Sequence, residues 1–145
     1  MPDKTNKMDE EIINPILKVK KLGIWMDHSN AHLMEFTTEP ITTKIITSKF
    51  THQEKEHSLS KGEKLMHHTE RHQQSAYYKK LGDAILDYED VIIFGPTEAK
   101  KELLNLLRAD RHFEKIRIEI EEADKMTQNQ QHAFVREYFS KRELR

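Results

Sequence analysis

Two aspartates follow stretches that read as strands, and carboxylates at strand ends can hold metal ions. Asp27 ends the first apolar stretch and Asp124 follows the last one. A two-metal hydrolase needs several carboxylates that converge within about 4 Å of paired ions. Asp83 and Asp87, on a stretch with helical spacing, are not evidently directed at Asp27. We therefore favour a turn role for Asp27, in which its side chain accepts hydrogen bonds from its own backbone.

Histidines gather in the polar stretch from residue 51 to residue 72, and they are His52, His57, His67, His68 and His72. His68 and His72 are four residues apart, so on a helix they would share one face and could hold a metal. No cysteine or fixed carboxylate stands out as a further ligand. We therefore expect solvent-facing histidines, which carry partial positive charge near neutral pH and can meet phosphate.

Basic side chains are concentrated between residues 98 and 117, although the net charge of the whole chain is −1. They are Lys100, Lys101, Arg108, Arg111, Lys115 and Arg117. Together with Lys79 and Lys80 they can form a phosphate-binding surface, and the alternative is a solvated helix face of mixed charge. Trp25 and Tyr78 can stack on bases, but Trp25 can equally pack against a sheet.

Composition limits the class of protein. The chain has 145 residues, enough for one domain with a real core, and 36% of them are hydrophobic. The absence of cysteine excludes disulfides, thiolate catalysis and zinc sites built on sulfur. No apolar run has the length of a signal region or a membrane span, so we expect a soluble cytoplasmic protein.

The stretch VIIFGPTEAKKELLNLL, residues 91–107, organises the predicted fold. Its four opening apolar residues do not alternate with polar ones, which predicts a central strand covered on both faces. Gly95-Pro96 ends the strand, and Thr97 can cap the helix that follows. Ala99, Leu103, Leu106 and Leu107 would form the buried face of that helix.

Three strands are predicted before this unit, at Leu22–Met26, Ala31–Thr37 and Ile41–Phe50. Residues 51–71 show no clean period, and we expect an exposed loop with at most one helical turn. A helix from His72 to Tyr88 follows, with a buried stripe of Tyr77, Leu81, Ala84, Ile85 and Tyr88.

After the central unit, a fifth strand is predicted at Ile116–Glu121, where isoleucine alternates with charged residues. Thr127 and Gln130 form a T-x-x-Q capping box that opens the last helix. The sequence thus predicts an α/β domain at residues 21–145, preceded by a mobile arm at residues 1–20. It has a mixed five-stranded sheet and three helices in the ribonuclease H-like order β-β-β-α-β-α-β-α.

With that order, the string Gln73-Gln74-Ser75-Ala76 resembles a motif of the archaeo-eukaryotic peptide release factors and Pelota-type rescue factors. In the release factors, the loop before the first helix of the middle domain carries Gly-Gly-Gln, commonly followed by Ser-Ala. Gln74 would take the glutamine position. The strings FGPTEAKKELLNLL and ADKMTQNQQHAFVREYF are similar to bacterial stand-alone proteins of this superfamily.

The motif departs from the family pattern, because His72 and Gln73 stand where the two glycines would be. Paired glycines allow backbone conformations that are closed to other residues. The resemblance therefore does not imply peptide release. Pelota-type factors lack the tripeptide and still use the ribosome, which implies a ribosome-linked role without hydrolysis.

We therefore expect a non-enzymatic, translation-associated factor that binds the ribosome or structured RNA and needs no cofactor or metal. The residues expected to bind RNA are His67, His68, His72, Gln74, Lys79, Lys80, Lys100 and Lys101. Two alternatives stay open. One is a metal-dependent nuclease or phosphoesterase that uses Asp27 and Asp124. The other is a protein–protein adaptor whose N-terminal arm docks a partner through the apolar patch at residues 12–17.

Overall fold

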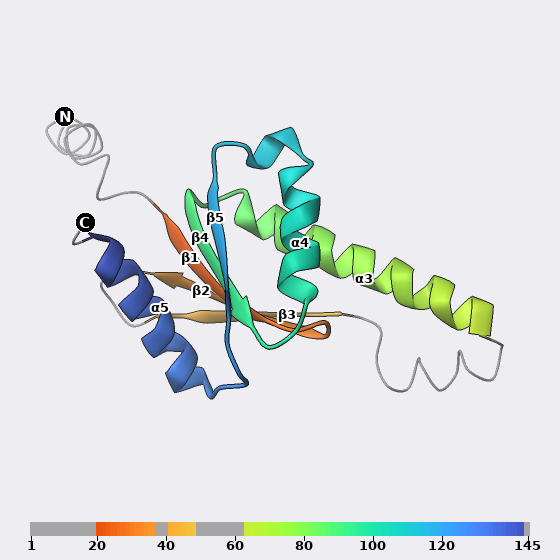
Figure 1. Cartoon of the computed structure of the whole chain (residues 1–145), viewed down its shortest axis with the longest axis horizontal. Helices are drawn as coiled ribbons and strands as arrows, with labels where there is room; N and C mark the ends of the chain where they lie inside the picture. The colour runs from red at the N-terminus through yellow and green to blue at the C-terminus, as the bar shows by residue number, and fades with distance from the viewer. Residues whose placement is uncertain (1–19, 37–40, 49–62, 144–145) are drawn as a thin grey trace, which may run out of the picture.

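A mixed five-stranded sheet forms the centre of the chain (Figure 1). The computed structural model describes residues 20–36, 41–48 and 63–143, and describes 63–70 and 142–143 by their backbone alone. The strands are β1 (Lys21–Met26), β2 (Asn30–Phe36), β3 (Thr43–Thr47), β4 (Asp90–Gly95) and β5 (Arg117–Glu122). Their spatial order is β3-β2-β1-β4-β5.

Strand direction changes at β1, the middle strand of the sheet. β1 pairs antiparallel with β2, which pairs antiparallel with β3. On its other side β1 pairs parallel with β4, which pairs parallel with β5. Across the described residues there are three α-helices, α3 (Glu63–Ile85), α4 (Ala99–Arg108) and α5 (Gln128–Glu143), and one short 3-10 helix, η1 (Arg111–Phe113). The predicted fold class and element order are confirmed.

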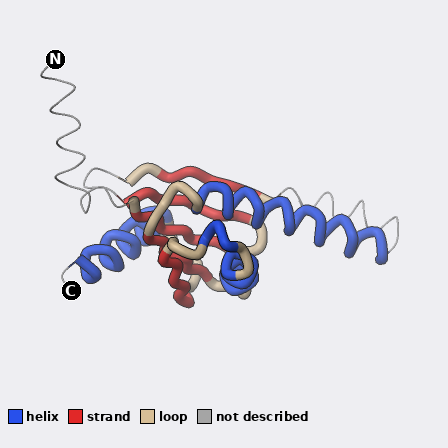
Figure 2. Tube along the Cα trace, turned by 90° about the horizontal axis from the view of Figure 1, so that it is seen from above, coloured by secondary structure: helices blue, strands red, loops and turns tan. Residues whose placement is uncertain are grey.

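The helices cover opposite faces of the sheet, α3 and α4 on one and α5 on the other, as both views show (Figures 1 and 2). Two apolar clusters result from this arrangement. The first joins α3 and α4 to the sheet through Ile24, Ile93, Tyr77, Leu81 and Leu103. The second joins α5 to the sheet through Trp25, Ile92, Phe94, Val135 and Phe139.

The central strand is enclosed, as its unbroken apolar run predicts. All four residues from Val91 to Phe94 are 0% exposed. Phe94 stacks on Phe134 of α5, with ring centroids 4.1 Å apart.

Glycine is needed at two positions in the sheet. A Cβ on Gly23 of β1 would lie 2.2 Å from a methyl carbon of Val135, so the missing side chain lets α5 pack directly on the strand. Gly95 has a φ of +155°, and a Cβ there would lie 2.0 Å from the carbonyl oxygen of Met26. Gly95 thus allows β4 to end against β1.

Helix α3 corrects the prediction of a loop up to residue 71. It begins at Glu63 and ends at Ile85, so residues 63–71 are helical and Tyr88 lies in the turn beyond the helix. Figures 1 and 2 show its first turns extending beyond the sheet. A helical segment that leaves the sheet has no core to face, which is why its sequence shows no apolar stripe. Residues 51–62, with His52 and His57, lie outside the described residues.

The two helices after β4 start close to where their capping residues predict. The Thr97 hydroxyl accepts a hydrogen bond from the Ala99 backbone N–H at 3.2 Å, and α4 begins at Ala99. Leu106 is 54% exposed, so its predicted burial is wrong, and Leu104 is buried instead. At the start of α5 both bonds of the capping box form, between Thr127 and Gln130, at 2.8 and 3.2 Å.

Within the part of the chain that the structure describes, no helix is long and apolar enough to cross a membrane. The predicted N-terminal arm lies outside the described residues up to residue 19.

Candidate nucleic-acid interface

Polar side chains meet where α3 and α4 pass the end of β1, and we call this group, His28, Gln74, Tyr78 and Glu102, the α3–α4 cluster. Glu102 is its centre. One carboxylate oxygen accepts a hydrogen bond from the Tyr78 hydroxyl at 2.6 Å, and the other lies 3.3 Å from His28 Nε2. The Gln74 side-chain amide donates to the His28 carbonyl at 3.4 Å. The cluster therefore ties two helices to the turn after β1.

Electrostatics fix the protonation of this cluster. Burial raises the pKa of the Tyr78 phenol well above its usual range, and the hydrogen bond to Glu102 raises it further. Partial burial alone would raise the pKa of Glu102, but hydrogen bonds from Tyr78 and His28 outweigh it and lower the pKa. At neutral pH Tyr78 is thus a neutral donor and Glu102 an anion, and the two hold each other in place.

Gln74, the residue at the glutamine position of the resemblance, lies within α3 and not in a loop before it. Its side chain is half-buried and bonds to the backbone after β1. A continuous helix has no place for the extended backbone that paired glycines would permit. The local geometry of Gln74 is that of a helix-anchoring side chain.

Asp27 takes the turn role that its sequence context favours. One carboxylate oxygen accepts hydrogen bonds from the backbone N–H groups of Ser29 at 2.8 Å and Asn30 at 2.7 Å. Its backbone carbonyl accepts a further bond from the Tyr77 hydroxyl at 2.9 Å. Asp124 is exposed beyond β5. Among the described residues, no group of three histidine, cysteine, aspartate or glutamate side chains could hold a metal ion.

The predicted basic residues divide into exposed and buried ones. Lys79 and Lys80 of α3 are exposed, as is His72 about two helical turns earlier. Lys101 of α4 is also exposed and lies 3.2 Å from Glu98. Lys100, by contrast, is 1% exposed. Since α3 and α4 cover the same face of the sheet, the exposed lysines belong to the outer surfaces of neighbouring helices.

Lys100 has two partners that compensate for its burial, a backbone carbonyl and the exposed carboxylate of Glu122. Its ammonium donates to the Thr97 carbonyl at 2.5 Å and lies 2.8 Å from a carboxylate oxygen of Glu122. The side chain therefore links the start of α4 to the end of β5. A phosphate contact would require this buried group to leave both partners, so Lys100 is not part of the exposed surface. The side chains of His67 and His68 lie outside the described residues.

The two aromatic residues considered for base stacking are both buried. Trp25 is 6% exposed in the cluster beneath α5, and Tyr78 is 5% exposed between α3 and α4. Neither ring is therefore available to a nucleobase. Arg117 is also separate from the lysines, because it pairs with Glu119 at 3.2 Å on the α5 side of the sheet.

Sequence reasoning missed two polar contacts between the sheet and α5. His32 Nδ1 lies 3.0 Å from the Gln131 side-chain oxygen, and the Thr43 hydroxyl lies 2.7 Å from His132 Nε2. Burial lowers the pKa of His132, and the nearby Arg136 lowers it further. One signal was available: Gln131 is four residues before Val135, so it falls on the buried face of α5, where a polar residue needs a partner.

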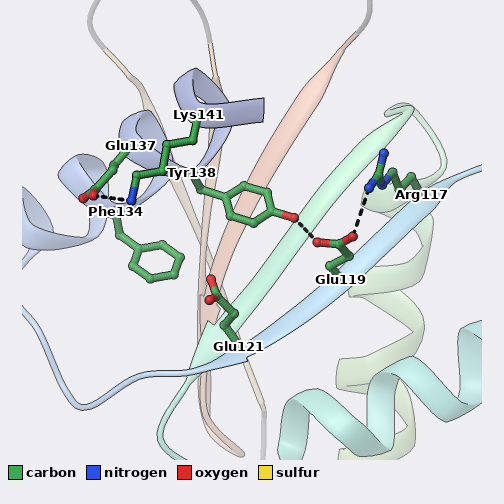
Figure 3. A pocket seen from close by; sticks show the side chains of 7 residues that line it. All are labelled: Arg117, Glu119, Glu121, Phe134, Glu137, Tyr138 and Lys141. Carbon is green, nitrogen blue, oxygen red and sulfur yellow. Dashed lines mark hydrogen bonds and ion pairs between the residues drawn. The ribbon is translucent and has the colours of Figure 1, made fainter. Parts of the chain in front are cut away.

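A groove of about 320 Å³ between β5 and α5 has an acidic character (Figure 3). Glu119, Glu121 and Glu137 line it, beside the rings of Phe134 and Tyr138. Two of the carboxylates have partners, because the Tyr138 hydroxyl donates to Glu119 and Lys141 lies 2.9 Å from Glu137. The three carboxylates outnumber the two cations of the lining, Arg117 and Lys141, so the groove has a net negative charge and disfavours phosphate. A polyanion is therefore better accommodated on the opposite side of the sheet.

Comparison with known proteins gives similarity in structure and not in sequence. No protein-family model matches the chain, and no curated protein matches it. The Pelota protein of Thermoplasma acidophilum aligns with 88% of this chain at 14% identity, with a TM-score of 0.52. Pelota of Archaeoglobus fulgidus aligns with 99% of it at 8% identity, with a TM-score of 0.57. The chain shares its fold with these two proteins. It spans 35% and 40% of their lengths, respectively.

Proposed function

We propose that this chain is a translation-associated factor of the cytoplasm that binds the ribosome or structured RNA and does not release peptides. The fold it shares with two Pelota proteins is the observation that carries the proposal. The family resemblance at residues 72–76 points to the same group of proteins. We further propose that the chain is a bacterial stand-alone relative of them.

The proposed RNA-binding surface is the outer side of α3 and α4. Lys79, Lys80 and Lys101 are exposed there, together with His72. The acidic groove between β5 and α5 lies across the sheet from them. The proposal also includes His67 and His68, which belong to the same helix in its first turns. Gln74 contributes by holding α3 against the turn after β1.

The region around Gln74 supports the proposed absence of peptide release. Neither glycine is present, and the helix runs through the positions where they would stand. Purified protein added to stalled ribosome complexes should leave peptidyl-tRNA intact, and the Gln74→Ala variant should behave identically. Hydrolysis that disappears in Gln74→Ala would contradict this part of the proposal.

Co-sedimentation with ribosomal particles at several salt concentrations tests the binding surface. Each phosphate contact to duplex RNA contributes about 0.9 to the slope of log affinity against log salt, so Lys79→Ala/Lys80→Ala should flatten it by up to about 1.8. The matched control is Lys125→Ala/Lys141→Ala, which removes the same charge from two exposed residues, one shortly before α5 and one in its last turn. Equal effects of the two double variants would refute the α3–α4 surface. If the wild type neither sediments with ribosomal particles nor binds free RNA, RNA binding is refuted altogether.

A further inference from the structure

A groove of about 520 Å³ with an apolar floor and a polar rim lies between α4, η1 and β5, and we call it the α4–β5 groove. The larger apolar residues of its lining are Leu104, Leu107, Phe113, Ile116 and Ile118. Leu104 and Phe113 are buried, whereas Ile116 and Ile118 are half-buried, so a ligand would reach the floor through these two isoleucines. This groove is separate from the α3–α4 cluster and from the acidic groove beneath α5.

Two arginines place positive charge on the rim of this groove. Arg108 and Arg111 are exposed, and neither forms an ion pair with any residue that the structure describes. Asp110 between them is already occupied, because its carboxylate accepts from the His112 backbone at 2.9 Å and lies 2.7 Å from His112 Nδ1. Glu114 is the other acid on the rim. A fitting ligand would combine apolar side chains with acidic ones.

The N-terminal segment of this chain has that chemistry. Asp9, Glu10 and Glu11 are followed directly by Ile12 and Ile13. A second apolar pair, Ile16-Leu17, comes after Pro15. The other segments outside the described residues, 37–40, 49–62 and 144–145, contain no acidic run joined to an apolar pair.

The described residues place Lys20, which follows the C-terminal end of this segment, near the groove. The Lys20 carbonyl accepts a hydrogen bond from Glu89 N–H at 2.9 Å, and the Glu89 carbonyl accepts one from Arg117 N–H at 3.0 Å. Lys20 is thus two strand spacings, about 10 Å, from Arg117, which directly follows Ile116 of the groove. The seven peptide units that join Ile13 to Lys20 span up to about 25 Å when extended, so the segment can reach the floor with chain to spare.

We propose that residues 9–17 dock in the α4–β5 groove of their own chain. Ile12 and Ile13 would cover the apolar floor around Phe113, and the three preceding carboxylates would face Arg108 and Arg111. The groove and the segment complement each other in both apolar surface and charge. This docking is independent of the proposed RNA binding, since it uses the opposite end of α4 from Lys101.

Disulfide trapping in the full chain tests the proposal, because the natural sequence contains no cysteine. Ile13→Cys/Arg111→Cys should form an intrachain disulfide under mild oxidation. The control is Ile13→Cys/Lys141→Cys, since Lys141 shares a groove with Arg117 and is within similar reach, but on the acidic side. We expect the first pair to close at least tenfold faster. Adding Ile12→Asp and Ile16→Asp should slow it to the control rate.

Each other outcome overturns the proposal. Equal rates for the two pairs would mean that the segment samples both sides without preference. A disulfide-linked dimer, seen on a non-reducing gel, would mean that the groove accepts a second copy of the chain. An unchanged rate after the aspartate substitutions would show that apolar contact does not hold the segment in the groove. Urea unfolding midpoints of the reduced variants, compared with wild type, establish that the folded protein is being trapped.

Discussion

Replacing Lys100 by methionine tests whether this lysine stabilises the fold or binds RNA. Methionine keeps most of the buried aliphatic stem and removes the ammonium, which bonds to Thr97 and Glu122. Hydrogen bonds to charged groups contribute about 1.5–3 kcal/mol, and the desolvation of the ammonium offsets part of that, so we expect a loss of about 1–2 kcal/mol in the free energy of unfolding. Lys100→Ala should cost more, by about 0.8 kcal/mol for each of the three methylenes lost.

Urea unfolding followed by tryptophan fluorescence measures these losses, because Trp25 is the single tryptophan and is 6% exposed. Lys101→Ala is the matched control. Its ammonium is exposed and pairs with Glu98 on the helix surface, so its removal should change stability by less than about 0.5 kcal/mol. If Lys100→Met unfolds like wild type and yet weakens ribosome binding more than Lys101→Ala does, Lys100 reaches RNA and this reasoning is refuted.

Two further changes test the sheet and its surroundings. Gly95→Ala should prevent folding, because a positive φ and a backbone contact at 2.0 Å together cost several kcal/mol, a large part of a domain's stability. Gly82→Ala is the control, because its new Cβ would meet ordinary contacts at 3.4 Å and should raise the free energy of unfolding by up to about 1 kcal/mol. Equal melting of the two variants would show that position 95 does not require glycine. Burial, with the hydrogen bond to Glu35, raises the pKa of Tyr88 from 10.0 to about 12. The phenol loses its proton more easily in the unfolded chain, so its contribution is complete below pH 10 and is lost between pH 10 and about 12. Urea midpoints at pH 9 and pH 11 should fall less steeply in Tyr88→Phe than in wild type, and identical slopes would contradict the assignment.

The features of the fold that depend on neighbouring residues could be predicted from sequence. The run Val91–Phe94 predicts a strand buried on both faces, because four consecutive apolar residues leave no polar face. The capping box at Thr127 is complete within four residues. The start of α3 could not be found in this way, because its first turns extend beyond the sheet and need no apolar stripe. Leu104 and Leu106 are both leucines on one helix, and only the packing of α4 decides which is buried.

The candidate site was less predictable, since its partners are distant in sequence. Lysines are seldom fully buried, so Lys100 reads as a surface residue until Glu122 is placed beside it. His32 and Gln131 are 99 positions apart, and no local pattern pairs them. Lys79 and Lys80, whose exposure follows from the apolar stripe of their own helix, were predictable because that stripe is local.

The position of β1 in the middle of the sheet sets the order in which the chain can fold. β1 can pair with β2 within a hairpin of 16 residues, from Lys21 to Phe36, as soon as both have been synthesised. Its other edge pairs with β4, whose first residue is Asp90, so this edge stays open through more than fifty further residues of synthesis. The exposed strand is apolar and its hydrogen-bonding groups are unpaired, which favours contacts with other chains. A nascent chain that stops before β4 is therefore the species most prone to aggregate, and the addition of β4 covers the open edge of β1.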